Sequence, residues 1–239
     1  METIAQALQQ VKRRIDEAVA VAARPPGSVQ VLAVSKTQPA GCVRQAFDAG
    51  QRAFGENYVQ EALDKISALA DLRQQLQWHL IGPLQSNKTR PVAEAFDWVH
   101  SVDRLKTAER LAEQRPPHLP PLQLCLQVNV SSEASKSGVA PDALLALAQA
   151  VAALPRERVQ LRGLMSIPAA ADGLAAQRAP HRVLRDLLGQ LKAAGLVLDT
   201  LSMGMSADLE AAVAEGSTLV RVGTAVFGQR AAPPVQPPA

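Results

Sequence analysis

The chain has 239 residues, of which 47% are hydrophobic, and its 25 Lys and Arg against 22 Asp and Glu give a net charge of +3. This composition excludes an intrinsically disordered chain, and because every long apolar stretch is interrupted by charges, we expect no membrane association. Aromatic residues make up only 3% and no basic cluster is dense, so we expect no nucleic-acid partner. Cys42 and Cys125 lie far apart, in neither disulfide nor zinc spacing. The N-terminal segment is not of signal-peptide type, which predicts a cytoplasmic protein.

Hydrophobic periodicity predicts an amphipathic N-terminal helix over residues 2–22, followed by alternating strands and helices. Eight apolar runs have the character of buried strands, at residues 29–35, 53–56, 77–82, 97–102, 122–130, 159–165, 198–203 and 218–222. Helical patterns lie between them, for example at residues 43–49, 59–69, 105–113, 143–154, 181–194 and 209–214.

Eight strand–helix units predict an α/β fold, a single parallel (β/α)8 barrel with an extra N-terminal helix. A doubly wound open sheet is the alternative, but the first strand–helix turn lacks the glycine-rich fingerprint expected of such a fold. We expect one domain over residues 1–230 and a disordered proline-rich tail at residues 231–239.

The first predicted strand runs directly into a lysine. The apolar run Val31–Val34 is followed by Ser35, Lys36 and Thr37. Barrels of this type carry their functional residues at the C-terminal ends of the strands. Loss of solvation would lower the pKa of a lysine there and make its neutral amine available for imine formation. The ordinary alternative is a lysine whose head group extends into solvent.

The last two predicted strands end in residues suited to binding phosphate. The seventh is followed by Gly204 and Ser206 just before a helix, and the eighth by Gly223 and Thr224. Many barrels hold phosphate with these two loops, through backbone N–H groups and a helix N-terminus. Ser206 could instead be an ordinary N-cap and Gly223 an ordinary turn residue. Opposite Lys36, however, the two loops together suggest a pocket for a phosphorylated carbonyl compound.

Several segments carry a more specific pattern. In chain order they are Val34–Thr37, Phe54–Tyr58, Trp78–Gly82 with Gln85–Lys88, Leu164–Met165, Leu201–Ser206 and Val220–Thr224. Together they resemble the pyridoxal 5′-phosphate (PLP) homeostasis proteins, which are small single-domain relatives of the barrel half of alanine racemase. The resemblance extends from about residue 2 to Gly228, with no departure at the motif positions.

This resemblance implies an alanine racemase N-terminal-domain-like barrel (PLP fold type III) that carries PLP as an imine on Lys36. It also implies that Arg221 faces the pyridine nitrogen. Residues expected to hold the phosphate are Ser206, Gly223 and Thr224, and residues expected beside the ring are Asn57 and His79.

An arginine at the pyridine nitrogen limits the chemistry, because a guanidinium stays protonated and accepts no proton. The ring then remains a weaker electron sink than one paired with Asp. Racemisation also needs a second acid–base group, on the face opposite Lys36. In alanine racemases that group is a tyrosine brought by an additional β domain of the partner chain. We expect no such domain here, and the one tyrosine of the sequence is Tyr58.

We therefore interpret the chain as a PLP carrier with little or no catalysis, which acts in vitamin B6 homeostasis by buffering PLP and by delivery to apo-enzymes. A PLP-dependent amino-acid racemase is the alternative, and a barrel aldolase is disfavoured because the resemblance lies elsewhere. We expect a monomer or a weak homodimer. Lys136, in the loop after the fifth predicted strand, is interpreted as a solvated side chain, with a second aldehyde site as the alternative.

Overall fold

A computed structural model describes residues 2–131 and 137–228. Within these residues, eight parallel strands close into a barrel in sequence order, with β8 paired to β1. The strands are β1 (Gln30–Val34), β2 (Ala53–Glu56), β3 (Gln77–Leu80), β4 (Trp98–Val102), β5 (Leu122–Gln127), β6 (Val159–Met165), β7 (Thr200–Ser202) and β8 (Leu219–Val222). The predicted (β/α)8 barrel is confirmed. Lys136 and the proline-rich tail lie outside the described residues, so those expectations stay predictions.

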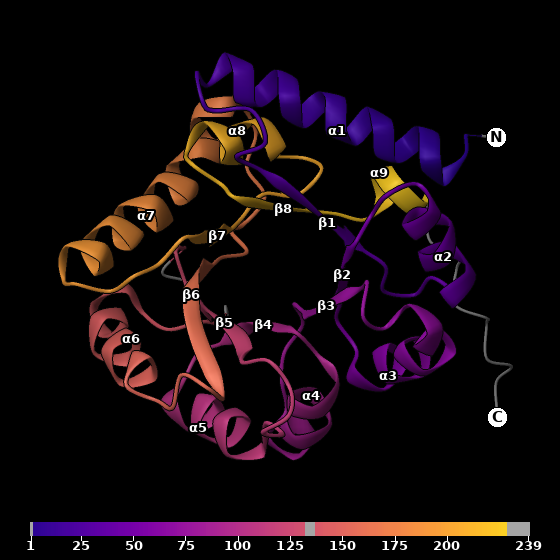
Figure 1. Cartoon of the computed structure of the whole chain (residues 1–239). Coiled ribbons are helices and arrows are strands. Elements are labelled where there is room, and N and C mark those ends of the chain that lie inside the picture. The colour runs from indigo at the N-terminus through magenta and orange to yellow at the C-terminus, as the bar shows by residue number, and fades with distance from the viewer. Residues whose placement is uncertain (1, 132–136, 229–239) are drawn as a thin grey trace, which may run out of the picture.

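Helices surround the barrel and cover its outer face (Figure 1). They are α1 (Ile4–Val21), α2 (Ala40–Asp48), α3 (Val59–Ala68), α4 (Thr89–Ala95), α5 (Leu105–Gln114), α6 (Leu144–Ala152), α7 (Leu174–Ala193), α8 (Leu209–Ala214) and α9 (Thr224–Phe227). All the predicted helices are present. The short helices α4 and α9 were not among those named from the sequence.

Helix α1 is the predicted additional N-terminal helix, and it packs against α8 and α9 (Figure 1). Thr3 and Gln6 form a capping box that fixes its start: Gln6 N–H donates to Thr3 Oγ1 at 3.2 Å, and Thr3 N–H donates to Gln6 Oε1 at 2.9 Å. Its buried face consists of Ala7, Leu8, Val11, Ile15, Ala18 and Val19. This apolar stripe covers the part of the barrel near the junction of β1 and β8, the first and last strands.

Helix α7 begins seven residues before its predicted start at His181. Pro180 explains the difference between the predicted and the observed start. A proline inside a helical pattern predicts a boundary because it donates no N–H, yet the helix continues through this one. The fully buried carboxylate of Glu215, which follows α8, contacts three arginines of α7, namely Arg178, Arg182 and Arg185. Burial alone would raise the pKa of Glu215, but hydrogen bonds from Arg178 and Arg182 hold it below its ordinary value. This ion cluster anchors α7.

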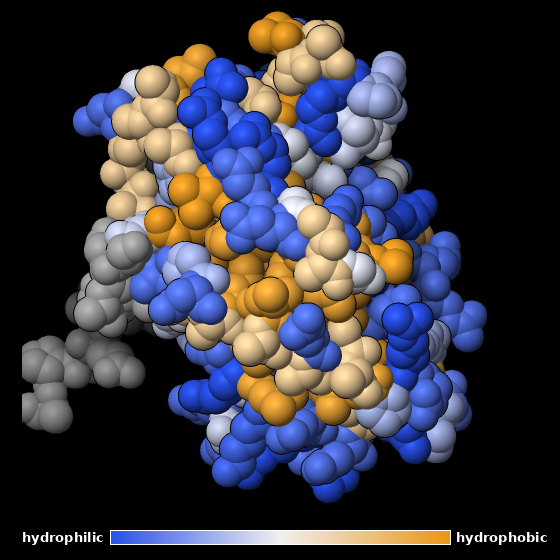
Figure 2. All heavy atoms as spheres, turned by 90° about the vertical axis from the view of Figure 1, so that its left-hand side faces the viewer, coloured by the Kyte–Doolittle hydropathy of each residue, from blue (hydrophilic) through white to orange (hydrophobic). Residues whose placement is uncertain are grey.

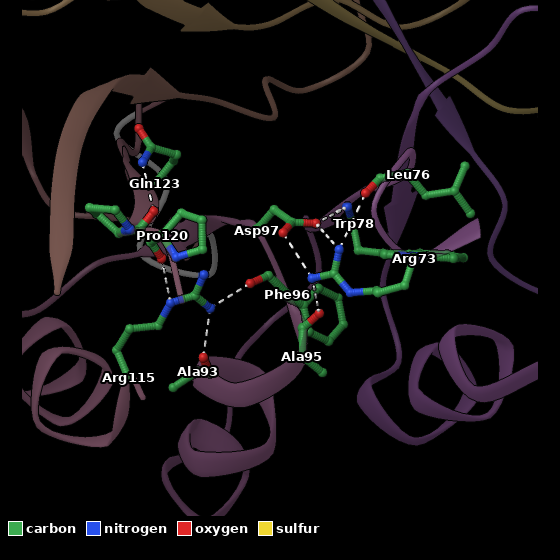
Figure 3. A network of polar contacts seen from close by, with 11 residues as sticks. Arg73, Leu76, Trp78, Ala93, Ala95, Phe96, Asp97, Arg115, Pro120 and Gln123 are labelled. Atoms are coloured by element: carbon green, nitrogen blue, oxygen red, sulfur yellow. Dashed lines mark hydrogen bonds and ion pairs between the residues drawn. The ribbon is translucent and has the colours of Figure 1, made fainter. Parts of the chain in front are cut away.

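Beside the N-terminal ends of β3 and β4, one carboxylate joins the two strands (Figure 3). Asp97 accepts hydrogen bonds from Arg73 Nη2 at 2.8 Å and from the backbone N–H of Trp78 at 2.8 Å. Because Trp78 lies in β3 and Asp97 directly precedes β4, the contact sets the register of the two strands.

A buried arginine holds the next turn of the barrel (Figure 3). Arg115, only 2% exposed, donates through Nη1 to the carbonyls of Ala93 and Phe96, both at 2.7 Å. Its Nε donates to the carbonyl of Pro120 at 2.8 Å. These three carbonyls belong to the end of α4 and to the segments leading into β4 and β5. The Arg115 side chain therefore supplies hydrogen bonds to three backbone carbonyls that have no partner in a helix or strand.

Figure 2 shows the face that carries α6 and α7, on which apolar side chains gather across the middle, bordered by hydrophilic ones. These two helices carry three of the exposed large apolar residues, Leu145, Leu174 and Val183. Among residues 2–131 and 137–228, no helix has the length and apolar character needed to cross a bilayer.

Replacing Arg115 with Met should lower the free energy of unfolding by about 3 kcal/mol, because each buried carbonyl left without a donor costs about 1–3 kcal/mol. Urea unfolding followed by circular dichroism measures the difference. Arg156→Met is the matched control, because Arg156 is exposed and its loss should change stability by no more than about 0.5 kcal/mol. Equal effects of the two substitutions would contradict the role given to Arg115.

Candidate functional site

The predicted lysine lies where β1 meets β8. Lys36 follows the buried Ser35 at the C-terminal end of β1 and is itself half-buried. It lines a small pocket with Gly223 and Thr224, which follow β8. The other lining residues are Val34, Gln38, Phe227 and Gly228. Closure of the barrel thus brings together three predicted site residues from opposite ends of the chain.

The β8 loop approaches β1 closely at Gly223. A Cβ on Gly223 would lie 3.2 Å from the carbonyl oxygen of Val34, closer than an ordinary contact. Helix α9 starts immediately afterwards, at Thr224. The first N–H groups of a helix have no acceptor within it, so Gly223 and Thr224 present backbone donors beside the pocket that contains Lys36.

The β7 loop turns sharply at Gly204, whose φ is +91° and whose Cβ, if present, would lie 2.4 Å from the Cβ of Ala212. Ser206 follows on this turn and is half-buried. The N-cap of α8 is Asp208, whose side chain accepts the Met205 N–H at 2.6 Å. Ser206 is therefore not the helix cap, and the ordinary alternative for this residue is wrong.

Arg221 lies inside the barrel, on β8, and is only 4% exposed. Its Nη1 donates to the backbone carbonyl of Ser202 at 2.5 Å and to Ser202 Oγ at 2.9 Å, and its Nη2 donates to the carbonyl of Ser166 at 2.8 Å. Burial lowers the pKa of Arg221 to about 10, so the guanidinium is still a cation at neutral pH. None of these hydrogen bonds among the described residues uses Nε, so that N–H remains as a donor.

His79 is placed deeper than a position directly beside Lys36. Its ring stacks on Trp98, and its Nδ1 lies 2.9 Å from His100 Nε2. His100 Nδ1 in turn lies 2.9 Å from Ser202 Oγ. His79 also lines a second cavity, with Gln77 and Trp98 from the N-terminal halves of β3 and β4. It therefore reaches Arg221 through His100 and Ser202.

The two histidines are neutral in the folded protein. Burial lowers the pKa of His79 to about 3, and burial, together with the positive charge of Arg221, lowers the pKa of His100 well below its ordinary value. Arg221 donates to Ser202 Oγ, so the Ser202 hydroxyl hydrogen can point to His100 Nδ1. His100 Nε2 then carries the hydrogen that His79 Nδ1 accepts, and the remaining hydrogen of His79, on its buried Nε2, has no acceptor among the described residues.

Asn57, predicted to lie beside the ring, follows β2. A Cβ on Gly82 would lie 2.3 Å from the carbonyl oxygen of Asn57, so the β3 loop reaches it only because residue 82 is a glycine. The buried Oδ1 of Asn57 and the buried Oγ of Ser166 have no hydrogen-bond partner among the described residues. Buried polar atoms are normally paired, so both atoms suit contacts with a bound polar ligand.

Sequence reasoning missed part of this arrangement. His100 and Ser202 connect His79 to Arg221, and Ser166 supports the guanidinium, yet none of the three was among the predicted site residues. The available signal was a histidine at an inward position of an otherwise apolar strand, two residues after Trp98. A serine at the end of a strand carries too little information to be chosen without the fold.

The protein-family model of the alanine racemase N-terminal domain matches residues 7–231 of this sequence. A pyridoxal phosphate homeostasis protein of Pseudomonas aeruginosa is 62% identical over 230 residues, covering 96% of this chain and 97% of the relative. One from Escherichia coli K12 is 52% identical over 231 residues, covering 96% and 98%.

The chain belongs to the alanine racemase N-terminal-domain family. Among solved structures, PipY of Synechococcus elongatus with PLP bound has a TM-score of 0.78 and 45% identity, covering 90% of this chain and 100% of PipY. The alanine racemase of Corynebacterium glutamicum has a TM-score of 0.70 at 16% identity, covering 98% of this chain and 62% of the racemase, a likeness of fold alone. The family expectation drawn from the motifs is confirmed.

The neutral histidine pair predicts a pH-dependent stability. Unfolded histidines bind protons below a pKa of about 6.5, whereas folded His79 does so only near 3, so the free energy of unfolding should fall as pH falls through this range. Each such histidine contributes about 1.4 kcal/mol per pH unit well below pH 6.5. Urea unfolding between pH 7.5 and 5 should show a shallower decline for His79→Gln than for the wild type. Identical slopes would indicate that His79 is protonated in the folded protein.

Proposed function

We propose that this protein binds PLP covalently through Lys36 and serves as an intracellular PLP reserve, with little or no catalysis of its own. The observation that carries the proposal is the pocket at the β1–β8 junction, where Lys36 lies beside the N-terminus of α9. Relatives covering nearly all of the chain bear the name pyridoxal phosphate homeostasis protein. PLP, when bound, supplies an aldehyde that condenses with amines and a ring that can withdraw electrons.

The residues present fit such a ligand. Lys36 supplies the amine, and Gly223 and Thr224 supply backbone donors for a phosphate in the same pocket. Ser206, in the neighbouring β7 loop, adds a hydroxyl. The buried Asn57 Oδ1 needs a hydrogen-bond donor, which supports the proposal that this residue lies near the ring.

Arg221 is the residue proposed to face the pyridine nitrogen. Its Nη1 and Nη2 are held by Ser202 and Ser166, so the plane of the guanidinium is fixed and Nε–H is directed along the remaining edge. With a pKa of about 10, Arg221 is a cation at neutral pH. It can donate a hydrogen bond to that nitrogen, but it has no site that could accept a proton. In this proposal His79 acts through His100 and Ser202 on the orientation of Arg221.

The same arrangement favours a carrier over a racemase. Racemisation requires one group to remove the α-proton and another to return it on the opposite face. Among the described residues that line the pocket with Lys36, none of the others is titratable. Tyr58, the one tyrosine of the chain, is 58% exposed at the start of α3. Transfer of PLP to apo-enzymes, and a monomeric or weakly dimeric state, complete the proposal.

Borohydride reduction of the PLP-loaded protein should place the pyridoxyl label on Lys36, and Lys36→Ala should lose the absorbance of the bound cofactor after dialysis. Peptide mass spectrometry identifies the labelled residue. As a test of the racemase alternative, the loaded protein should exchange the α-proton of neither D- nor L-amino acids in deuterated water. A label mainly on another lysine would refute the assignment, and rapid exchange would refute the carrier.

Phosphate contacts should determine affinity. Each hydrogen bond to a charged group contributes about 1.5–3 kcal/mol, so Ser206→Ala and Thr224→Val should each weaken PLP binding about tenfold to a hundredfold. The wild type should likewise bind unphosphorylated pyridoxal poorly, as measured by equilibrium titration. Ser67→Ala, in the last turn of α3, is the control and should leave PLP affinity unchanged. Equal affinities for pyridoxal and PLP would leave the β7 and β8 loops without the proposed role.

A further inference from the structure

A buried ion network lies directly beneath the segment that carries Lys36. Its centre is Lys65 on α3, whose side chain is only 6% exposed. Its Nζ donates to the backbone carbonyl of Ser35 at 2.6 Å and to Glu56 Oε1 at 2.8 Å, and it forms an ion pair with Glu61 Oε1 at 2.7 Å. The ammonium thus has three close oxygen neighbours, two that accept its hydrogen bonds and one that is its ion-pair partner. The Ser35 hydroxyl also donates to Glu56 Oε1, at 2.6 Å.

The network holds both peptide groups that flank Lys36. The carbonyl of Ser35 belongs to the peptide group before Lys36, and Lys65 binds it directly. The N–H of Thr37 belongs to the peptide group after Lys36, and it donates to Glu61 Oε1 at 2.5 Å. Because the same Glu61 oxygen also forms an ion pair with Lys65, one ammonium is linked to the backbone on both sides of Lys36.

The backbone at this point has an unusual conformation. Thr37 has a φ of +65°, a value that β-branched residues rarely adopt. The turn is closed by the Gln38 N–H, which donates to the Ser35 carbonyl at 3.0 Å. A strained residue persists only where its surroundings hold it, and here the Glu61 carboxylate holds the Thr37 N–H. The direction in which the chain leaves Lys36 therefore depends on the network.

Stability alone does not account for these charges. A buried ion pair is often no more stabilising than well-packed apolar residues of similar size, since both ions lose their hydration. Burial raises the pKa of Glu56 despite the opposing charge and hydrogen bond of Lys65. What an apolar replacement could not supply is a set of directed donors and acceptors for the Ser35 and Thr37 peptide groups.

We propose that Lys65, acting through Glu56 and Glu61, is a positioning residue that aims the Lys36 amine at the aldehyde carbon of bound PLP. In the step concerned, the neutral Lys36 nitrogen adds to that carbon, a C=N bond forms, and the aldehyde oxygen leaves as water with both amine hydrogens. The inference rests on the proposed function, since it concerns the same lysine. It assigns Lys65 no contact with the ring or the phosphate.

Two ligands can distinguish positioning of the Lys36 amine from general support of the pocket. PLP carries the aldehyde, whereas 4′-deoxypyridoxine 5′-phosphate has the same ring and phosphate with a methyl group in its place. Glu61→Leu removes the acceptor for the Thr37 N–H, and Glu61→Gln retains an oxygen there. We expect Glu61→Leu to weaken PLP binding and slow C=N formation about tenfold, the loss of one hydrogen bond to a charged group, and to leave the deoxy analogue within about twofold. Glu61→Gln should restore most of the PLP affinity.

Lys65→Met gives a second test, with Lys106→Met on the exposed face of α5 as its control. Lys65→Met should show the same selective loss for PLP, and Lys106→Met should bind both ligands as the wild type does. If Lys65→Met does not fold, the Glu61 pair still decides, because the Glu61 side chain is 31% exposed and tolerates exchange more readily. Titration and stopped-flow absorbance provide both measurements.

The outcomes are distinct. Selective loss of PLP binding, restored by Gln at position 61, supports positioning. An equal loss for both ligands would mean that the network only supports the pocket, and no loss for either would mean that Lys36 is oriented by other contacts; each result overturns the inference while the proposed function stands. Failure of the wild type to bind either ligand would overturn the proposed function and the inference with it.

Discussion

A buried cation, Arg221, imposes the main constraint on the barrel interior. A guanidinium that is only 4% exposed must have acceptors within the protein, and it finds them in the Ser202 backbone and hydroxyl and in the Ser166 carbonyl. Its charge also acts on His100, whose pKa is lowered first by burial and then by the nearby guanidinium. The interior is therefore polar and cationic at one point, which suits an anionic, nitrogen-containing ring placed above it.

Close backbone approaches make that arrangement possible. A Cβ on Gly163 would lie 1.8 Å from the carbonyl oxygen of Thr200, so β6 and β7 can pair at this spacing only with glycine there. The same pairing brings Ser166 and Ser202, at the ends of these strands, within reach of Arg221; the Ser166 N–H donates to the Ser202 carbonyl at 3.3 Å. The close packing of β6 against β7 thus determines where the guanidinium of Arg221, on β8, can be held.

Much of the fold could be predicted because each strand is a short apolar run with turn residues at its ends. The grouping of Lys36 with Gly223 and Thr224 followed from topology, since closure must place the end of β8 beside the end of β1. His100 could not be identified in this way, because which residues of a strand point inward depends on the stagger of the closed barrel.

The network around Lys65 was equally hidden. Its members come from β1, β2 and α3, and a buried lysine on a helix looks in the sequence like any exposed one. Helix α7 shows the opposite error. Pro180 is a strong local signal for a helix boundary, but packing of His181, Leu184 and Leu188 on one buried face, together with the arginine contacts to Glu215, outweighs the lost hydrogen bond.

A proposed PLP reserve and an enzyme built on the same barrel differ in one respect. The reserve only has to retain PLP, whereas the enzyme must also bind a second substrate and catalyse its reaction. In the proposed site, water would reverse a C=N bond to Lys36, because Lys36 is only half-buried and Thr224 beside it is exposed. In that proposal, retention of PLP depends on the β7 and β8 loops and on Arg221, which would contact the phosphate and the ring, features that PLP keeps in every chemical state. Catalysis would need groups that recognise a second substrate, and the pocket beside Lys36 is lined by no other titratable side chain among the described residues. A site that recognises only the cofactor can hold it and release it intact, which is the behaviour a reserve requires.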